Sequence, residues 1–164
     1  MLRRSRGRRL GEVVHRHAAQ EDALTQVAGA IPLDWRRGRV ERSDLGRFLF
    51  SAEDVVVAVG QDGLVANVAK YLDRQTVIGI NPEPDRNPGV LVAHPPGAIG
   101  DLLRTASVNR YIQARTMVRA TTDDGQTLLA LNEIYLGHGS HQSARYRIEV
   151  PGGGRGRQSS PGIP

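Results

Sequence analysis

The residues best suited to chemistry form a short glycine-containing loop, Gly60-Gln61-Asp62-Gly63. The loop follows the apolar, β-branched run 55–59 and precedes a stretch with helical periodicity, so it joins a strand to a helix. In open α/β sheets, ligands bind at this carboxyl edge of the strands. Glycine lets backbone N–H groups approach a phosphate, and a helix N-terminus adds partial positive charge. The position therefore favours a phosphate-containing ligand.

Asp62 is unexpected in a loop that only holds phosphate, because a carboxylate repels an anion. It fits a site in which a carboxylate takes a proton from a hydroxyl group, or holds Mg²⁺, beside the phosphate. The alternative is structural: Asp62 N-caps the helix while Gly60 and Gly63 make the turn. The spacing alone leaves both interpretations open.

Helical and strand patterns alternate over residues 12–108, the part of the chain that carries this loop. The alternation predicts a Rossmann-like, doubly wound α/β domain with a mostly parallel sheet. Asn81 directly follows the second predicted strand, so we expect it at the same sheet edge as the loop. The predicted helices are 12–29, 64–72 and 99–106, and the predicted buried strands are 55–59, 76–80 and 90–92.

The pattern changes after residue 108. Two strand-like segments flank Asp123-Asp124-Gly125, which is typical of a β-hairpin turn, and an alternating third segment precedes residue 150. We therefore predict a partial antiparallel β domain at 109–150. The remaining residues, 151–164, include five glycines and three prolines and have few apolar side chains to bury. They predict a disordered tail.

Positive charge concentrates in the first 20 residues, which hold six arginines against Glu12 alone. The other 144 residues carry 16 basic and 16 acidic side chains. We predict that residues 1–11 form a disordered, solvated arm. The neutral remainder and the 4% aromatic content argue against a nucleic-acid partner. The alternative is that the arm tethers a nucleic acid, which predicts binding with steep salt dependence.

The composition excludes several classes of site. The 164 residues contain no cysteine, which excludes disulfides, thiolate zinc sites, iron–sulfur centres and thiol nucleophiles. No apolar run approaches the ~20 residues of a membrane span, and no apolar segment follows the N-terminal arginines as in a secretory signal. We expect a soluble, cytoplasmic protein without a membrane partner. An organellar transit peptide is the alternative, because residues 2–9 are rich in Arg and Ser and lack acids.

Four segments occur in the order found in the NAD kinases. Residues 54–63 resemble the strand and Gly-Gly-Asp-Gly motif of that family, with Gln61 in place of the second glycine. Residues 77–81 and 87–91 resemble its Gly-x-Asn strand and the glycine-containing segment that follows. Residues 130–134, Ala-Leu-Asn-Glu-Ile, are similar to the Ala-Leu-Asn-Glu motif that begins its second, all-β domain. The resemblance covers roughly residues 54–150.

The resemblance implies a phosphotransferase that moves a phosphoryl group from ATP, or another donor, to the 2′-hydroxyl of NAD, with Mg²⁺ accompanying the ATP. The family's aspartate accepts the proton of the ribose hydroxyl, a role that maps to Asp62. Family members commonly assemble through the β domain, which implies a homo-oligomer. The residues expected to contact the substrates are Gly60, Gln61, Gly63, Asn81, Asn132, Glu133 and, across a one-residue gap, Arg145.

Two departures from the family pattern leave alternatives open. Gln61 adds a side chain to the loop, which would narrow it or alter the choice of phosphate donor. The family also continues into a Thr-Gly-x-Thr segment and further strands that have no counterpart after residue 150. One alternative is a catalytically inactive nucleotide-binding or assembly fragment. The other is a lipid or sugar kinase of the same superfamily, although Asn132 and Glu133 favour the dinucleotide.

Overall fold

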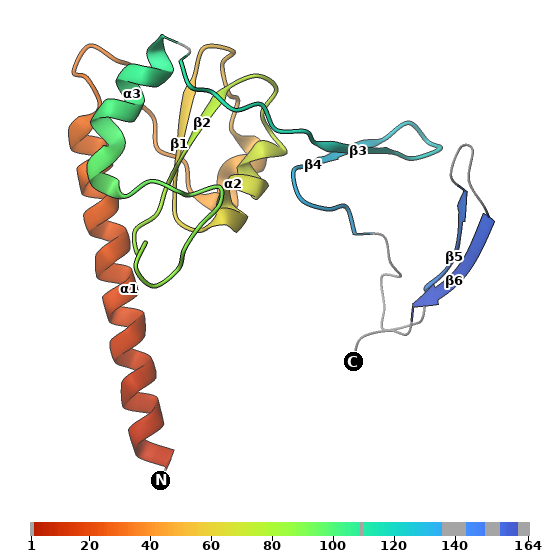
Figure 1. Ribbon diagram of the computed structural model, residues 1–164, viewed down its shortest axis with the longest axis horizontal. Coiled ribbons are helices and arrows are strands. Elements are labelled where there is room, and N and C mark those ends of the chain that lie inside the picture. The colour runs from red at the N-terminus through yellow and green to blue at the C-terminus, as the bar shows by residue number, and fades with distance from the viewer. Residues whose placement is uncertain (1, 109, 136–143, 150–154, 161–164) are drawn as a thin grey trace. The chain divides into compact units, whose positions relative to one another are not determined.

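The structure, a computed structural model, describes residues 2–108, 110–135, 144–149 and 155–160. The chain divides into two compact units, residues 1–132 and 133–164, and each is described by itself. The first unit holds the helices α1 (Leu2–Ala30), α2 (Asp62–Ala69) and α3 (Ile99–Ser107), the short 3₁₀ helices η1 (Arg42–Arg47) and η2 (Pro96–Ala98), and the strands β1 (Val55–Val59), β2 (Thr76–Ile80), β3 (Val118–Thr121) and β4 (Thr127–Ala130) (Figure 1). The second unit holds β5 (Ala144–Glu149) and β6 (Arg155–Ser160).

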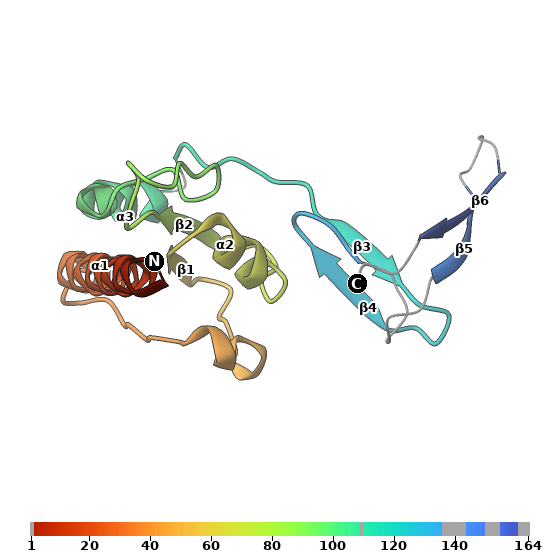
Figure 2. The same ribbon diagram turned by 90° about the horizontal axis from the view of Figure 1, so that it is seen from below.

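Strands β1 and β2 form a parallel pair with the register Val55↔Thr76 through Val59↔Ile80. Helices α1 and α3 lie on one face of the pair, and α2 lies on the other (Figure 2). A β-branched run fits this position, because strands that are covered on both faces need apolar side chains at every residue. The predicted strands 55–59 and 76–80 are confirmed, as are the helices that follow them.

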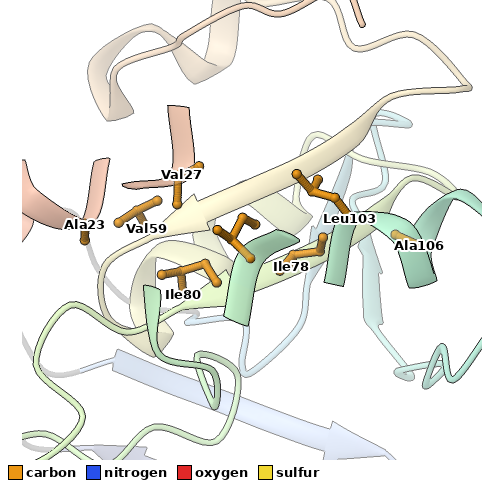
Figure 3. Packing of buried hydrophobic residues seen from close by; sticks show 8 residues of the cluster. Ala23, Val27, Val59, Ile78, Ile80, Leu103 and Ala106 are labelled. Atoms are coloured by element: carbon orange, nitrogen blue, oxygen red, sulfur yellow. The ribbon is translucent and has the colours of Figure 1, made fainter. Parts of the chain in front are cut away.

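The largest apolar cluster lies between the strand pair and the helices α1 and α3 (Figure 3). Ile80 is its most deeply buried member, with none of its surface exposed. Side chains alternate between the faces of a strand, so every second residue of each strand enters this cluster. Its buried members are Ala23, Val27, Val59, Ile78, Ile80, Ile99, Leu103 and Ala106.

The opposite face of the strand pair is covered by α2 and by two segments without regular strand structure. Leu45 of η1 packs with Val68 and Leu72 at one end. At the other end Ala58 packs with Val65 and Val92, together with the partly buried side chains of Leu91 and Leu131. The segment around residues 91–92 therefore lies on the α2 side of the sheet.

The doubly wound, mostly parallel sheet expected from the sequence is not shown, and residues 90–92 do not form the predicted third strand. Parallel pairing in the described residues is limited to β1, β2 and an isolated bridge between Ile80 and His94. The physical reason is that the backbone N–H groups of residues 90–92 donate to a side-chain carboxylate instead of a neighbouring strand. The fold shown is mixed α/β with a two-stranded parallel sheet.

The predicted hairpin is confirmed as the antiparallel pair β3–β4, with the register Val118↔Ala130 through Thr121↔Thr127. Its turn is closed by a hydrogen bond from the Thr122 N–H to the Gln126 carbonyl, 2.9 Å long. Gly125 has φ +85°, a conformation that side-chain-bearing residues rarely adopt. The Asp-Asp-Gly sequence therefore supplies the glycine that this turn requires.

The described residues at the two ends of the chain differ from the prediction of disorder, while residues 151–154 and 161–164 of the predicted tail lie outside the described residues. Helix α1 begins at Leu2, so the predicted arm is helical, in keeping with the good helix propensity of its arginines and leucines. Residues 155–160 of the predicted tail form β6, whose backbone pairs with β5 (Figure 1). No helix in the described parts of the chain is both long and apolar enough to span a membrane.

Candidate functional site at the carboxyl edge of β1 and β2

The glycine-containing loop lies where β1 ends and α2 begins, as the sequence predicts. The Gly60 N–H donates to the Ile80 carbonyl at 2.9 Å, which holds the loop beside the end of β2. Gln61, not Asp62, is the N-cap residue of α2, and its exposed side chain makes no capping hydrogen bond. Asp62 is the first residue of the helix, so the N-capping interpretation of its carboxylate is not what the structure shows.

The Asp62 carboxylate accepts hydrogen bonds from three consecutive backbone N–H groups. Its Oδ2 lies 2.9 Å from the Val90 nitrogen, and its Oδ1 lies 2.8 Å from the Leu91 nitrogen and 2.9 Å from the Val92 nitrogen. Asp62 and these three amides are 28 to 30 residues apart in sequence. The Asp62 side chain therefore fixes the 90–92 segment against the start of α2. We call this arrangement the Asp62 clamp.

These contacts stabilise the charged form of Asp62. The Val90 amide has the largest effect and lowers the pKa of the carboxyl below its ordinary value of 3.8, and the Val92 and Leu91 amides act in the same direction. Partial burial opposes them, because it disfavours the charge. Asp62 is therefore ionised at neutral pH. An ionised carboxylate offers about four acceptor positions, and the three amides occupy three of them.

Two glycines allow the 90–92 segment to lie close to β2 and to Asp62. A Cβ on Gly79 would lie 2.0 Å from the Leu91 carbonyl oxygen and 2.9 Å from the Val92 Cα. A Cβ on Gly89 would lie 3.0 Å from Oδ1 of Asp62. Sequence reasoning noted these glycines but missed the clamp; a glycine within a buried strand is the signal that another backbone approaches there.

Asn81 stabilises the beginning of the loop that leads from β2 to the 90–92 segment. Its side chain is buried, with 3% of the residue exposed, and its amide donates to the Asn87 carbonyl at 2.7 Å. Its Oδ1 accepts from the Glu83 N–H at 3.0 Å, and its own N–H donates to the His94 carbonyl at 2.8 Å. The structure places Asn81 at the predicted edge, but both polar groups of its side chain bind the loop backbone.

Helix α1 reaches this edge through two polar contacts that the sequence did not reveal. Nε2 of Gln20 donates to the Val59 carbonyl at 2.8 Å, at the last residue of β1. Nδ1 of His15 lies 3.4 Å from Oε1 of Glu83, a carboxylate that also lies 3.4 Å from Arg86 Nη1. Helical spacing in the sequence indicates only the apolar face of α1 and gives no signal for these polar partners.

The remaining predicted site residues fall in different parts of the molecule. Asn132 is exposed and ends the first unit, directly after Leu131, which packs against the α2 side of the sheet. Glu133 is exposed and begins the second unit, as the first residue after the division. Arg145 belongs to β5 of that unit. Of the predicted site residues, the structure brings five together at one edge of the strand pair: Gly60, Gln61, Asp62, Gly63 and Asn81.

The described residues contain no group of three or more histidine, aspartate or glutamate side chains that could hold a metal ion. What the edge offers is a fixed, ionised carboxylate beside exposed loop residues at a helix start. No protein family, curated protein or solved structure matches this chain.

Proposed function

We propose that the chain is an NAD kinase-like phosphotransferase, which moves a phosphoryl group from ATP or another donor to the 2′-hydroxyl of NAD. The observation that carries the proposal is the Asp62 clamp, which holds an ionised carboxylate at the strand edge with one acceptor position left over. The order of the sequence motifs supports the choice of NAD. The doubly wound parallel sheet and the homo-oligomer of such kinases belong to the same proposal.

In the proposed reaction, the ribose 2′-oxygen forms a bond to the γ-phosphorus of ATP, and the bond from that phosphorus to the ADP oxygen breaks. The hydroxyl proton passes to the free acceptor position of Asp62 and from there to solvent. Phosphoryl transfer leaves little covalent work for the protein, so positioning the hydroxyl group is the main task of this carboxylate. The lowered pKa keeps the carboxylate charged over the neutral range, so that it accepts a hydrogen bond from the hydroxyl group and orients it.

The remaining contacts follow from the same proposal. The Gly63 N–H group faces the phosphates, together with the backbone of Gly60, whose own N–H is bound to the Ile80 carbonyl. Gln61 limits the width of the loop, and Asn81 keeps the 81–89 backbone in place. Asn132, Glu133 and Arg145 bind the dinucleotide.

Mg²⁺ enters the proposal with the ATP. Protein sites for this ion commonly use one or two carboxylates together with substrate phosphates, so a cage of three protein ligands is not required. When bound, Mg²⁺ supplies positive charge to the donor phosphates. The amides leave Asp62 one acceptor position, which the proposal assigns to the hydroxyl group, so the donor phosphates and not Asp62 would hold the ion.

The Asp62 clamp also favours a second candidate function, a nucleotide-binding protein without catalytic activity. In this reading the carboxylate serves only to hold the 90–92 segment, and the loop binds the dinucleotide through its backbone. Both candidates predict NAD binding. They differ in whether NADP forms.

The test is to incubate the full chain with NAD, ATP and Mg²⁺ and to measure NADP for the wild type, Asp62→Asn and Asp54→Asn. Asp54 is the matched control, because its Oδ2 accepts a single backbone N–H, that of Ser51 at 2.8 Å, at the opposite end of β1. Asp62→Asn should lower the rate by about 10²–10⁴-fold, the range for a group that assists proton transfer. Asp54→Asn should leave the rate within about twofold of the wild type.

Thermal stabilisation by NAD is measured on the same three proteins, so that loss of folding is not mistaken for loss of chemistry. NADP formation that Asp62→Asn abolishes while NAD still stabilises the variant supports the kinase. Stabilisation of the wild type by NAD without NADP supports the inactive binder. Absence of both contradicts both candidates, and ATP consumption with a sugar or lipid alcohol in place of NAD would favour the other kinases.

A further inference from the structure

The pairing of β5 with β6 gathers arginines from two separate stretches of sequence. The antiparallel register places Arg147 directly opposite Arg157, Arg145 opposite Ser159, and Glu149 opposite Arg155. Successive residues of a strand alternate between its faces, and directly paired residues share a face. Four arginine positions therefore lie on one face of this two-stranded ribbon, and Arg147 is exposed. We call this the arginine face.

The arginine face destabilises the pairing of β5 with β6 when no partner is bound. Like charges directly opposite each other in an antiparallel pair are destabilising, and Arg147 and Arg157 form such a pair. Glu149 is the single acidic position on the face, and it is already opposite an arginine. An isolated two-stranded ribbon is at best marginally stable in water. A bound polyanion would remove the repulsion and stabilise the pairing.

We propose that the arginine face binds the phosphate backbone of duplex nucleic acid, a function that shares Arg145 with the kinase proposal but does not rest on it. Arginines two residues apart on one strand are about 7 Å apart, and directly opposite positions are about 5 Å apart. Duplex DNA carries one negative charge per about 1.7 Å of its axis, so phosphates on both strands lie within reach of such an array. A two-stranded β-ribbon also has the width that the major groove admits.

The chemistry of the face favours phosphate over other anions. All four basic positions are arginine, whose planar fork of donors binds phosphate oxygens in pairs. The tyrosine of β5, Tyr146, is placed by the register on the opposite face, so base stacking has no part in this binding. The contact is with the backbone and does not depend on base sequence.

The pairing also explains why the sequence alone argued against such a partner. The arginines at 155 and 157 belong to a segment whose glycines and prolines predict disorder, and separate from β5 they look like scattered charges. Only the β5–β6 register brings them onto the face that carries Arg145 and Arg147.

The test measures the affinity of the full chain for a fluorescent duplex DNA of about 20 base pairs by anisotropy, at several salt concentrations. Four phosphate contacts give a slope of about −3.6 in a plot of log K against log salt, which is about a 150-fold loss of affinity between 50 and 200 mM. The double variant R147Q/R157Q should reduce the slope by about two. The double variant R147K/R157K keeps the charge and should retain most of the slope, because the slope follows the number of cationic side chains that contact phosphate.

The matched control is R4Q/R8Q, which removes the same charge from the start of α1. This control should leave the slope within about one of the wild-type value. Absence of binding at low salt, or a loss carried by R4Q/R8Q instead of R147Q/R157Q, overturns the proposal; the second result assigns binding to α1. An equal loss of slope in R147Q/R157Q and in R4Q/R8Q also overturns the proposal, because only net charge would then matter. Equally tight binding of a polyglutamate peptide would identify an acidic protein as the partner instead.

Discussion

The parallel pair β1–β2 and the hairpin β3–β4 are both two-stranded, and they differ in what covers them. In the parallel pair, Ala58, Val59, Ile78 and Ile80 are all buried, because helices pack on both faces. In the hairpin strands Ala130 is the buried residue, at 3% exposed. The parallel pair thus depends on contacts between distant segments, whereas the hairpin depends on its turn and on the one end that reaches the core.

An aspartate whose pKa is lowered by hydrogen bonds lies next to each strand pair, Asp62 at the start of α2 and Asp124 in the hairpin turn. Their hydrogen-bond partners lie at very different distances along the chain. Asp62 accepts N–H groups from residues 28 to 30 positions away. Asp124 accepts from Thr122 and Gln126, each two positions away. A local network can form before the rest of the chain folds, whereas the Asp62 clamp exists only in the folded first unit. The contrast predicts different responses to mutation.

The largest difference is expected from truncating one side chain in each region. Ile80→Ala should lower the free energy of unfolding by about 2–5 kcal/mol, because Ile80 is completely buried and the change leaves a cavity. Leu128→Ala should lower it by less than about 1 kcal/mol, since Leu128 is 51% exposed and loses little buried surface. Urea unfolding followed by circular dichroism measures both. Similar losses for the two variants would contradict the contrast in burial.

Substitution of a glycine by alanine gives the next largest effect and tests whether the 90–92 segment lies close against β2. Gly79→Ala should lower the free energy of unfolding by about 1–3 kcal/mol, because its Cβ would displace the Leu91 backbone. Gly63→Ala is the control: its Cβ meets no atom within 4 Å, and alanine in a helix is favoured by about 0.5–1 kcal/mol. The two variants should therefore change stability in opposite directions. A neutral Gly79→Ala would show that the 90–92 segment does not lie against β2.

Local patterns in the sequence were enough to predict β1, β2, α2, α3 and the β3–β4 hairpin. Each of these elements is specified by its own residues: a β-branched run, an apolar stripe at helical spacing, or a glycine at a turn. The placement of Gly60, Asp62 and Asn81 at one edge was predicted too, because the carboxyl ends of adjacent parallel strands meet there. These predictions needed no information on distant contacts.

The errors concern segments whose structure depends on a partner far away in sequence. Residues 90–92 have the composition of a buried strand, yet their N–H groups bind Asp62, and no local pattern reports that choice. Residues 155–160 have the composition of a disordered tail, and their strand exists through pairing with β5. The start of α1 has the charge pattern of a solvated arm, but its arginines and leucines have good helix propensity and the segment is helical.

The smallest effect, and the one most specific to the two aspartates, is a dependence of stability on pH. The folded-state pKa of Asp62 lies below its ordinary value of 3.8, so its contribution to stability is fully present above that value. The contribution is lost as the pH falls through the folded-state pKa, because the unfolded chain takes up its proton first. Asp62→Asn should therefore be less stable than the wild type at neutral pH, and the difference should shrink as the pH falls from 3.8 through the lowered folded-state pKa.

Asp124→Asn is the comparison for that experiment. The pKa of Asp124 is also lowered, chiefly by the Thr122 hydroxyl group and then by the Gln126 amides, but these partners remain nearby in the unfolded chain. A network that persists on unfolding shifts the pKa in both states and adds little to the pH dependence. Urea unfolding at several pH values should thus give a pH-dependent difference for Asp62→Asn that exceeds the one for Asp124→Asn. The reverse order would mean that the hairpin turn, and not the clamp, is where ionisation is linked to folding.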